Sequence, residues 1–135
     1  MSRRPIRPDR VRRIQRGFAA IENRFLHEGF FASLGQLERS LYFFLVLAAD
    51  RHGVSFYAYD KICSTLGVSP DDYISARNAL IDKDLIAFDG SAFQVLSLPN
   101  SPVLRPRAAL STQEGFERDD PATIRQLIAD SLQPR

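Results

Sequence analysis

The sequence predicts a small α+β domain that is mainly helical, and three stretches carry this prediction. Residues 60–86 contain the start and stop signals of two short helices joined by a tight turn. Residues 41–52 are apolar for most of their length, which is typical of a buried helix. Two β-prone runs flank the turn signal Asp89-Gly90-Ser91, so a hairpin is expected there.

The first of the two joined helices should end at Leu66. Ile62, Cys63 and Leu66 give it an apolar face, because residues one, three and four apart lie on one side of a helix. Gly67 follows, in the position where a residue of left-handed conformation commonly ends a helix. The turn between the two helices is therefore expected at Gly67.

The second helix has a well-marked start at Ser69. The Ser69 side chain can cap the helix, and Pro70 suits the first helical position because its missing N–H would be unpaired there. Asp71 and Asp72 place negative charge at the positive end of the helix dipole. We expect this helix to run from Ser69 to about Lys83.

The faces of this second helix can be assigned from spacing. Tyr73, Ala76 and Leu80 recur at intervals of three and four, so they should form the buried stripe. The opposite face should then be acidic, with these residues exposed and Arg77 near its edge: Asp71, Asp72, Ile74, Ser75 and Asn78. If this helix lies in or near the major groove of DNA, the candidates for contacts to bases or phosphates are Ser75, Arg77 and Asn78. The hairpin turn around Gly90 would then touch the DNA backbone.

The order of expected elements is helix 41–52 ended by Gly53, strand 54–59, helix, turn, helix and hairpin. The chain from residue 38 to residue 98 resembles the winged helix-turn-helix domains of phage and plasmid replication-initiation proteins and of many bacterial regulators. The stretches that carry the resemblance are LYFFLVLAADRHGVSFYAYDKICSTLGVS and ARNALIDKDLIAF. The resemblance implies DNA binding without catalysis.

Positive charge is concentrated at the N-terminus. Residues 1–16 contain seven arginines and one acidic residue, giving +6, so the net charge of +2 leaves −4 on residues 17–135. With two prolines and few apolar residues, this segment should be a flexible arm that neutralises phosphates or enters a narrow minor groove. A solvated tail, or a tail that pairs with an acidic protein, is the alternative. The arginines are Arg3, Arg4, Arg7, Arg10, Arg12, Arg13 and Arg16.

Residues 17–34 are rich in large apolar side chains at helical spacing. We expect an amphipathic helix, interrupted at Gly29, that extends the domain of residues 17–98. Because so much apolar surface would not stay in water, the helix should either pack on the domain or form a dimer surface. A homodimer is therefore one of the expected partners.

The C-terminal part of the chain has a different character. Residues 99–120 contain several prolines and should form a linker. Asp120 can cap, and Pro121 can open, a short helix within residues 121–135. Such a helix is marginal alone and should pack on its own domain, on a second copy or in the groove of a partner protein.

Several functions are not supported by any motif in the sequence. No phosphate-binding glycine loop, nucleophile elbow or paired cysteine is present, so neither an enzyme nor a cofactor is expected. His27 and His52 lack neighbours at metal-ligand spacing, and Cys63 should be a buried structural thiol. No apolar run spans a membrane and no signal peptide is evident, so we expect a cytoplasmic protein.

These observations lead to two functional hypotheses. The first is a non-enzymatic DNA-binding protein in transcription, replication or mobile-element biology, in which the arginine arm supplies most of the affinity. The second is an accessory subunit whose helix-turn-helix binds a partner protein, because its acidic second helix is unfavourable for DNA and a fold alone does not define a function.

Overall fold

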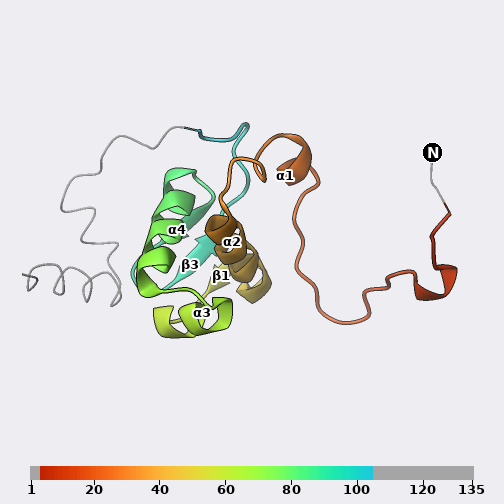
Figure 1. The fold of residues 1–135 in the computed structure, drawn as a ribbon, viewed down its shortest axis with the longest axis horizontal. Coiled ribbons are helices and arrows are strands. Elements are labelled where there is room, and N and C mark those ends of the chain that lie inside the picture. The colour runs from red at the N-terminus through yellow and green to blue at the C-terminus, as the bar shows by residue number, and fades with distance from the viewer. Residues whose placement is uncertain (1–3, 105–135) are drawn as a thin grey trace, which may run out of the picture.

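The computed structural model describes residues 4–104, which form an α+β structure that is mainly helical (Figure 1). The prediction of fold class is confirmed at this level. In the described part the chain forms, in order, the 3-10 helix η1 (Pro8–Arg10), the helices α1 (Arg24–His27) and α2 (Gln36–Ala48), the strand β1 (Val54–Ser55), the helices α3 (Tyr59–Leu66) and α4 (Pro70–Asp82), and the strands β2 (Ile86–Phe88) and β3 (Phe93–Val95).

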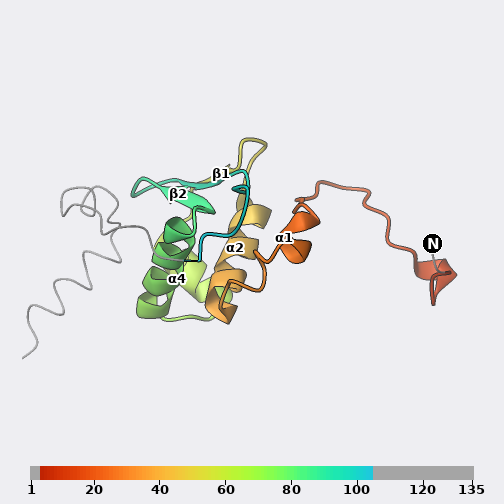
Figure 2. The same ribbon diagram turned by 90° about the horizontal axis from the view of Figure 1, so that it is seen from above.

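The three strands form an antiparallel sheet in the order β1-β3-β2. Strands β2 and β3 make the expected hairpin, with Phe88 paired to Phe93 at its closed end. The Asp89 carboxylate holds the turn, since its Oδ1 accepts hydrogen bonds from the backbone N–H groups of Ser91 and Ala92, at 2.9 and 2.7 Å. Figure 2 shows the sheet lying on one side of α2 and α4.

The two joined helices begin and end as the sequence predicts. Gly67 has a φ of 69°, and its N–H donates to the Cys63 carbonyl, which closes α3 with a left-handed residue. The Ser69 hydroxyl accepts a hydrogen bond from the Asp72 N–H at 3.1 Å, so Ser69 caps α4. Pro70 occupies the first position of α4.

Helix α2 lies earlier in the chain than the predicted range of 41–52. It begins at Gln36 and ends at Ala48. The Asp50 carboxylate ends it early, because Asp50 Oδ1 accepts from the N–H groups of His52 and Val54 and thereby stabilises a turn in place of a further helical turn.

Gly53 belongs to this turn, where the chain passes close to β3. Its φ is 84°, and a Cβ atom on it would lie 2.6 Å from the Val95 carbonyl oxygen. The following strand is shorter than the predicted range of 54–59, because β1 pairs with β3 at Val54 and Ser55 alone.

The hydrophobic core lies between α2, α3, α4 and the sheet. Tyr73, Ala76 and Leu80 of α4 are buried, as predicted from their spacing, and Leu80 is completely covered. Cys63 is also buried, in agreement with a structural role.

The predicted helix over residues 17–34 is wrong for most of its length. Helical structure is confined to α1, and at Gly29, with a φ of 90°, the chain leaves the helical path. The alternative that this segment packs on the domain is nevertheless confirmed in part, because Phe25, Phe30 and Leu34 are buried in the core. Phe18 is 72% exposed.

The aromatic side chains explain why the segment folds irregularly. Phe25 stacks on Tyr42 of α2 with ring centroids 4.9 Å apart and also contacts Phe30 and Phe31. Placing three neighbouring rings around one site requires turns that a straight helix does not make.

The predicted linker is described as far as residue 104 and forms no helix or strand there, while the expected C-terminal helix lies outside the described residues.

Candidate nucleic-acid interface

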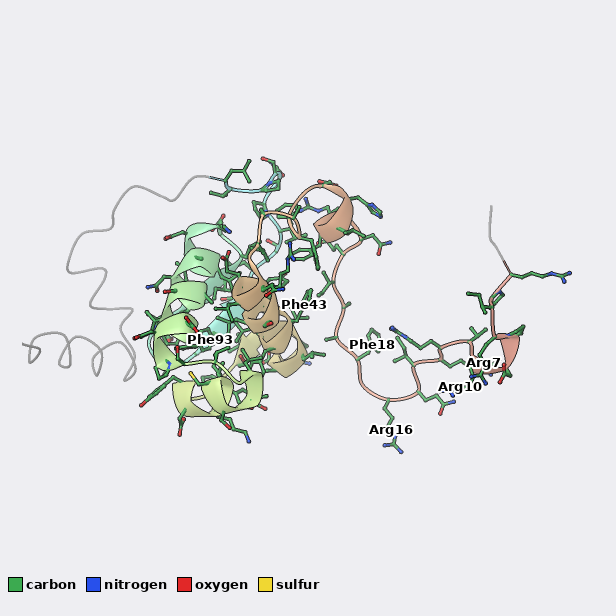
Figure 3. All side chains as sticks on the ribbon, in the orientation of Figure 1. Arg7, Arg10, Arg16, Phe18, Phe43 and Phe93 are labelled. Carbon is green, nitrogen blue, oxygen red and sulfur yellow. The ribbon has the colours of Figure 1, made fainter. Side chains whose placement is uncertain are left out.

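The arginine arm extends away from the folded body (Figure 3). Each residue from 4 to 16 is exposed, including six of the arginines that the sequence singles out, while Arg3 lies outside the described residues. Asp9 pairs with Arg7 at 2.9 Å, and both side chains are about two-thirds exposed. Such an exposed pair contributes little energy, so the guanidinium groups of the arm are available to an anionic partner.

Arg77 does not lie at the exposed edge of α4, and that expectation is wrong. Its side chain is 2% exposed and lies beneath the hairpin, with Cζ 5.1 Å from the centre of the Phe88 ring and 5.7 Å from that of Tyr73. Arg77 Nε and Nη2 both donate to Asn78 Oδ1, at 3.2 and 3.1 Å. Arg77 therefore holds α4 against β2 and cannot reach DNA in this conformation.

The outer face of α4 carries the remaining candidates. Ser75 and Asn78 are exposed, as are Asp71 and Asp72 in the first turn. Since Arg77 is the basic residue of α4 and is buried, the outer face of this helix is acidic. Carboxylates at a helix N-terminus occupy the position where a phosphate would otherwise be favoured.

Most other basic side chains of the body are engaged in structural contacts. Arg24 pairs with Glu22 and Glu28, each at 3.2 Å, and its Nη2 donates to the Leu98 carbonyl at 2.8 Å. The last contact fixes the chain after β3 against α1. Arg24 thus serves the fold of the body.

Two further cations have similar roles. Arg39 Nε donates to the Phe31 carbonyl at 3.1 Å, and its guanidinium lies 4.4 Å from the centre of the Phe31 ring. Lys83, just after α4, donates to the Ser33 carbonyl at 2.7 Å and pairs with Glu38 of α2. These contacts attach the irregular segment before α2 to the rest of the body.

The body therefore offers few cations to a nucleic acid. Residues 17–104 contain six basic and ten acidic side chains, for a charge of −4. Four of the six basic residues make the contacts described above. The other two, Arg51 in the turn before β1 and Lys61 in α3, are exposed.

An aromatic hollow near the hairpin turn was not anticipated from the sequence. It measures about 450 Å³ and lies between the β1–α3 connection and Gly90. Phe56 is 73% exposed at its rim, and Tyr57 is held by an edge-to-face contact with Phe44. The signal was the aromatic run FYAY, which lies within the strand predicted over residues 54–59.

Two exposed aspartates of the body are held in their charged form by the backbone. N–H groups of Val54 and His52 lower the pKa of Asp50, and N–H groups of Ala92 and Ser91 lower the pKa of Asp89. Both carboxylates stabilise tight turns. They add negative charge at the ends of the sheet.

Within residues 4–104, no group of three or more histidine, cysteine, aspartate or glutamate side chains is placed to hold a metal ion. None of the helices in this range is long and apolar enough to cross a membrane. Comparison of the chain with protein-family models, with curated proteins and with solved structures gives no match.

Proposed function

We propose that this chain is a non-enzymatic, cytoplasmic DNA-binding protein with a winged helix-turn-helix body. It would serve transcription, replication or a mobile element as an accessory factor. The order α2, β1, α3, α4, β2, β3 and the strand order β1-β3-β2 support a winged helix in which the β2–β3 hairpin is the wing. The arm, and not α4, would supply most of the affinity.

The separation of charge is the observation that carries this proposal. Residues 4–16 present six exposed arginines, whereas the body has a charge of −4 and uses most of its cations internally. Neutralisation of phosphates releases counterions and favours binding whatever the DNA sequence. Ser75 and Asn78, with the wing around Gly90, would add contacts near the groove without adding charge.

Fluorescence anisotropy with labelled duplex DNA at low salt tests this proposal. We expect the full chain to bind and a variant lacking residues 2–16 to lose most of its affinity. A matched variant in which the arm arginines are replaced by lysine keeps the charge, so it should retain most of the non-specific affinity, whereas replacement by glutamine should not. Failure of the full chain to bind duplex or single-stranded DNA would overturn the proposal.

A second candidate function is supported by the acidic face of α4. Asp71 and Asp72 are exposed in its first turn, and the basic residue of the helix is buried. In this case the winged helix would dock on a basic partner protein, and the arm would reach nucleic acid held by that partner. Replacing Asp71 and Asp72 by asparagine distinguishes the two functions, since it should weaken a protein complex and should strengthen binding to DNA.

A further inference from the structure

The N-terminal segment contains two short helical turns, η1 and α1, separated by residues 11–23. Pro8 starts the turn η1 with Asp9 beside it, and proline at the first position with acid in the first turn is the usual start of a helix. The turn α1 ends at His27, two residues before Gly29. Residues 11–23 between these turns are not helical in this structure.

The spacing of the intervening residues nevertheless fits a helix. Val11, Ile14, Phe18 and Ile21 recur at three, four and three residues, and Phe25 continues the same phase four residues later. Phe25 is buried, whereas the other four are 53%, 54%, 72% and 38% exposed, in chain order. On a helix these five side chains would share one face, here called the apolar stripe.

The arginines would occupy the opposite face of that helix. At 100° per residue, Arg12, Arg13 and Arg16 cluster about half a turn away from the apolar stripe. One face would then bury apolar surface while the other presented three guanidinium groups together. In an extended arm these two sets of side chains are not separated.

The body has a hollow that could receive the apolar stripe. Its lining includes residues 18–22, Val46 and Leu47 of α2, and residues 95–98, and its volume is about 320 Å³. Leu47 is 75% exposed although it lies on a core helix. Figure 1 shows the chain before α1 running alongside α2, and in Figure 3 Phe18 lies beside that helix.

The direction of the two segments makes the fit specific. Phe25 stacks on Tyr42, and the chain before α1 runs antiparallel to α2. A helix extended backwards from α1 would therefore carry Ile21 and Phe18 towards Val46 and Leu47. The apolar stripe and the exposed part of α2 would cover each other.

Two features keep the helix from forming in the absence of a partner. Gly17 lies in its middle and disfavours helix through its conformational entropy. Arg12 and Arg16 are four residues apart and Arg13 and Arg16 three apart, so their like charges repel on the helix surface. Phosphate groups on that face would remove the repulsion.

We propose that DNA binding converts residues 11–23 into helix, joining η1 and α1 into one helix from Pro8 to His27. Its length would be about 30 Å. Arg12, Arg13 and Arg16 would face the phosphates of duplex DNA, and the C-terminal half of the apolar stripe would pack on α2. This inference rests on the proposed function, because it assigns DNA to the arm.

Substitutions at Gly17 test the inference without changing charge. A Cβ atom at Gly17 meets nothing within 4 Å, so alanine introduces no clash in the present conformation. Gly17→Ala should raise the affinity for duplex DNA about fivefold, since alanine favours helix over glycine. Gly17→Pro should lower the affinity at least tenfold. Far-UV circular dichroism of the full chain should show a gain of about 13 helical residues with DNA. The alanine variant should reach the same final helix content at a lower DNA concentration, and the proline variant should show a much smaller gain.

A second pair of variants tests the apolar stripe. Phe18→Ser should reduce both affinity and the helix gain, whereas Ile6→Ser should change neither, because Ile6 is 99% exposed and precedes the stripe. If DNA binds without a helix gain and the Gly17 variants bind equally, the inference is wrong and the proposed function stands. If the parent chain binds no DNA, both are wrong.

Discussion

The guanidinium of Arg77 lies over the ring of Phe88, with its Cζ 5.1 Å from the ring centre, so α4 and β2 are joined by a buried cation. Because Arg77 is the basic residue of α4, this contact removes positive charge from the outer face of that helix. It also makes the residue important for stability.

We expect Arg77→Ala to lower the free energy of unfolding by about 1 to 3 kcal/mol, because it removes packing against Phe88 and Tyr73 and leaves a cavity. The DNA affinity of the folded variant should equal that of the parent. Urea unfolding and anisotropy measure the two quantities. Ser75→Ala on the outer face of α4 is the control and should change stability by less than about 0.5 kcal/mol. A loss of affinity with unchanged stability would show that Arg77 reaches DNA after all.

Leu80 is completely buried where α4 faces α2. Leu80→Ala should cost about 2 to 5 kcal/mol, which is a large share of the stability of a small domain. Leu47→Ala removes the same atoms from a side chain that is 75% exposed, so its effect in the DNA-free protein should be small. Equal melting temperatures for the two variants would contradict the packing described here.

The arm predicts a strong salt dependence of DNA binding. If it contacts about 4 phosphates, each contributes about −0.9 to the slope of log affinity against log salt. Deleting residues 2–16 should therefore flatten the slope by roughly 3 to 4 units. Titrations over a range of salt concentrations measure this slope, and an unchanged slope would assign the phosphate contacts to the body.

The cap of α4 can be tested separately from the function. Ser69→Ala removes the acceptor of the Asp72 N–H and should cost about 1 kcal/mol. Ser69→Asn retains an acceptor and should restore most of this loss. The comparison is made by chemical denaturation, and equal stability of all three proteins would mean that water replaces the cap.

The β2–β3 hairpin should loosen in acid. A carboxyl group whose pKa is lower in the folded than in the unfolded state adds stability above its unfolded pKa, and that contribution is lost as pH falls through the folded pKa. Two backbone N–H groups lower the pKa of Asp89 in this way, so the loss should occur below its usual value of roughly 4.

Amide chemical shifts of Ser91 and Ala92, followed by nuclear magnetic resonance during an acid titration, measure this transition. Asp89→Asn should abolish it, because the amide does not titrate in this range. A midpoint at or above the usual aspartate value would contradict the hydrogen bonds at the turn.

The sequence predicted α3, the turn and α4 closely because their signals are local. The Ser69 cap, Pro70 and Gly67 each act within a few residues, so no distant contact was needed to place them. The hairpin was predicted for the same reason, since Asp89 and Gly90 define its turn.

Elements that depend on distant contacts were predicted less well. The segment 17–34 has the apolar spacing of a helix, but the packing of Phe25 on Tyr42 and the turn at Gly29 limit helix to four residues. Arg77 was predicted near the edge of the exposed face and is buried instead. Its position four residues after the buried Tyr73 is the signal that would have found it. The DNA contacts of the arm, of Ser75 and of Asn78 stay predictions.

The turn at Gly53 has an evolutionary consequence. A side chain there would meet the Val95 carbonyl oxygen at 2.6 Å, and the backbone has a φ of 84°, so two independent constraints exclude other residues. The function proposed for the arm, by contrast, requires only charge and spacing, which many sequences supply. Descendants of a common ancestor that kept this backbone should therefore share Gly53 and the Gly67-Val68-Ser69-Pro70 turn long after their arms have diverged, and those glycines are the positions by which such relatives would be recognised.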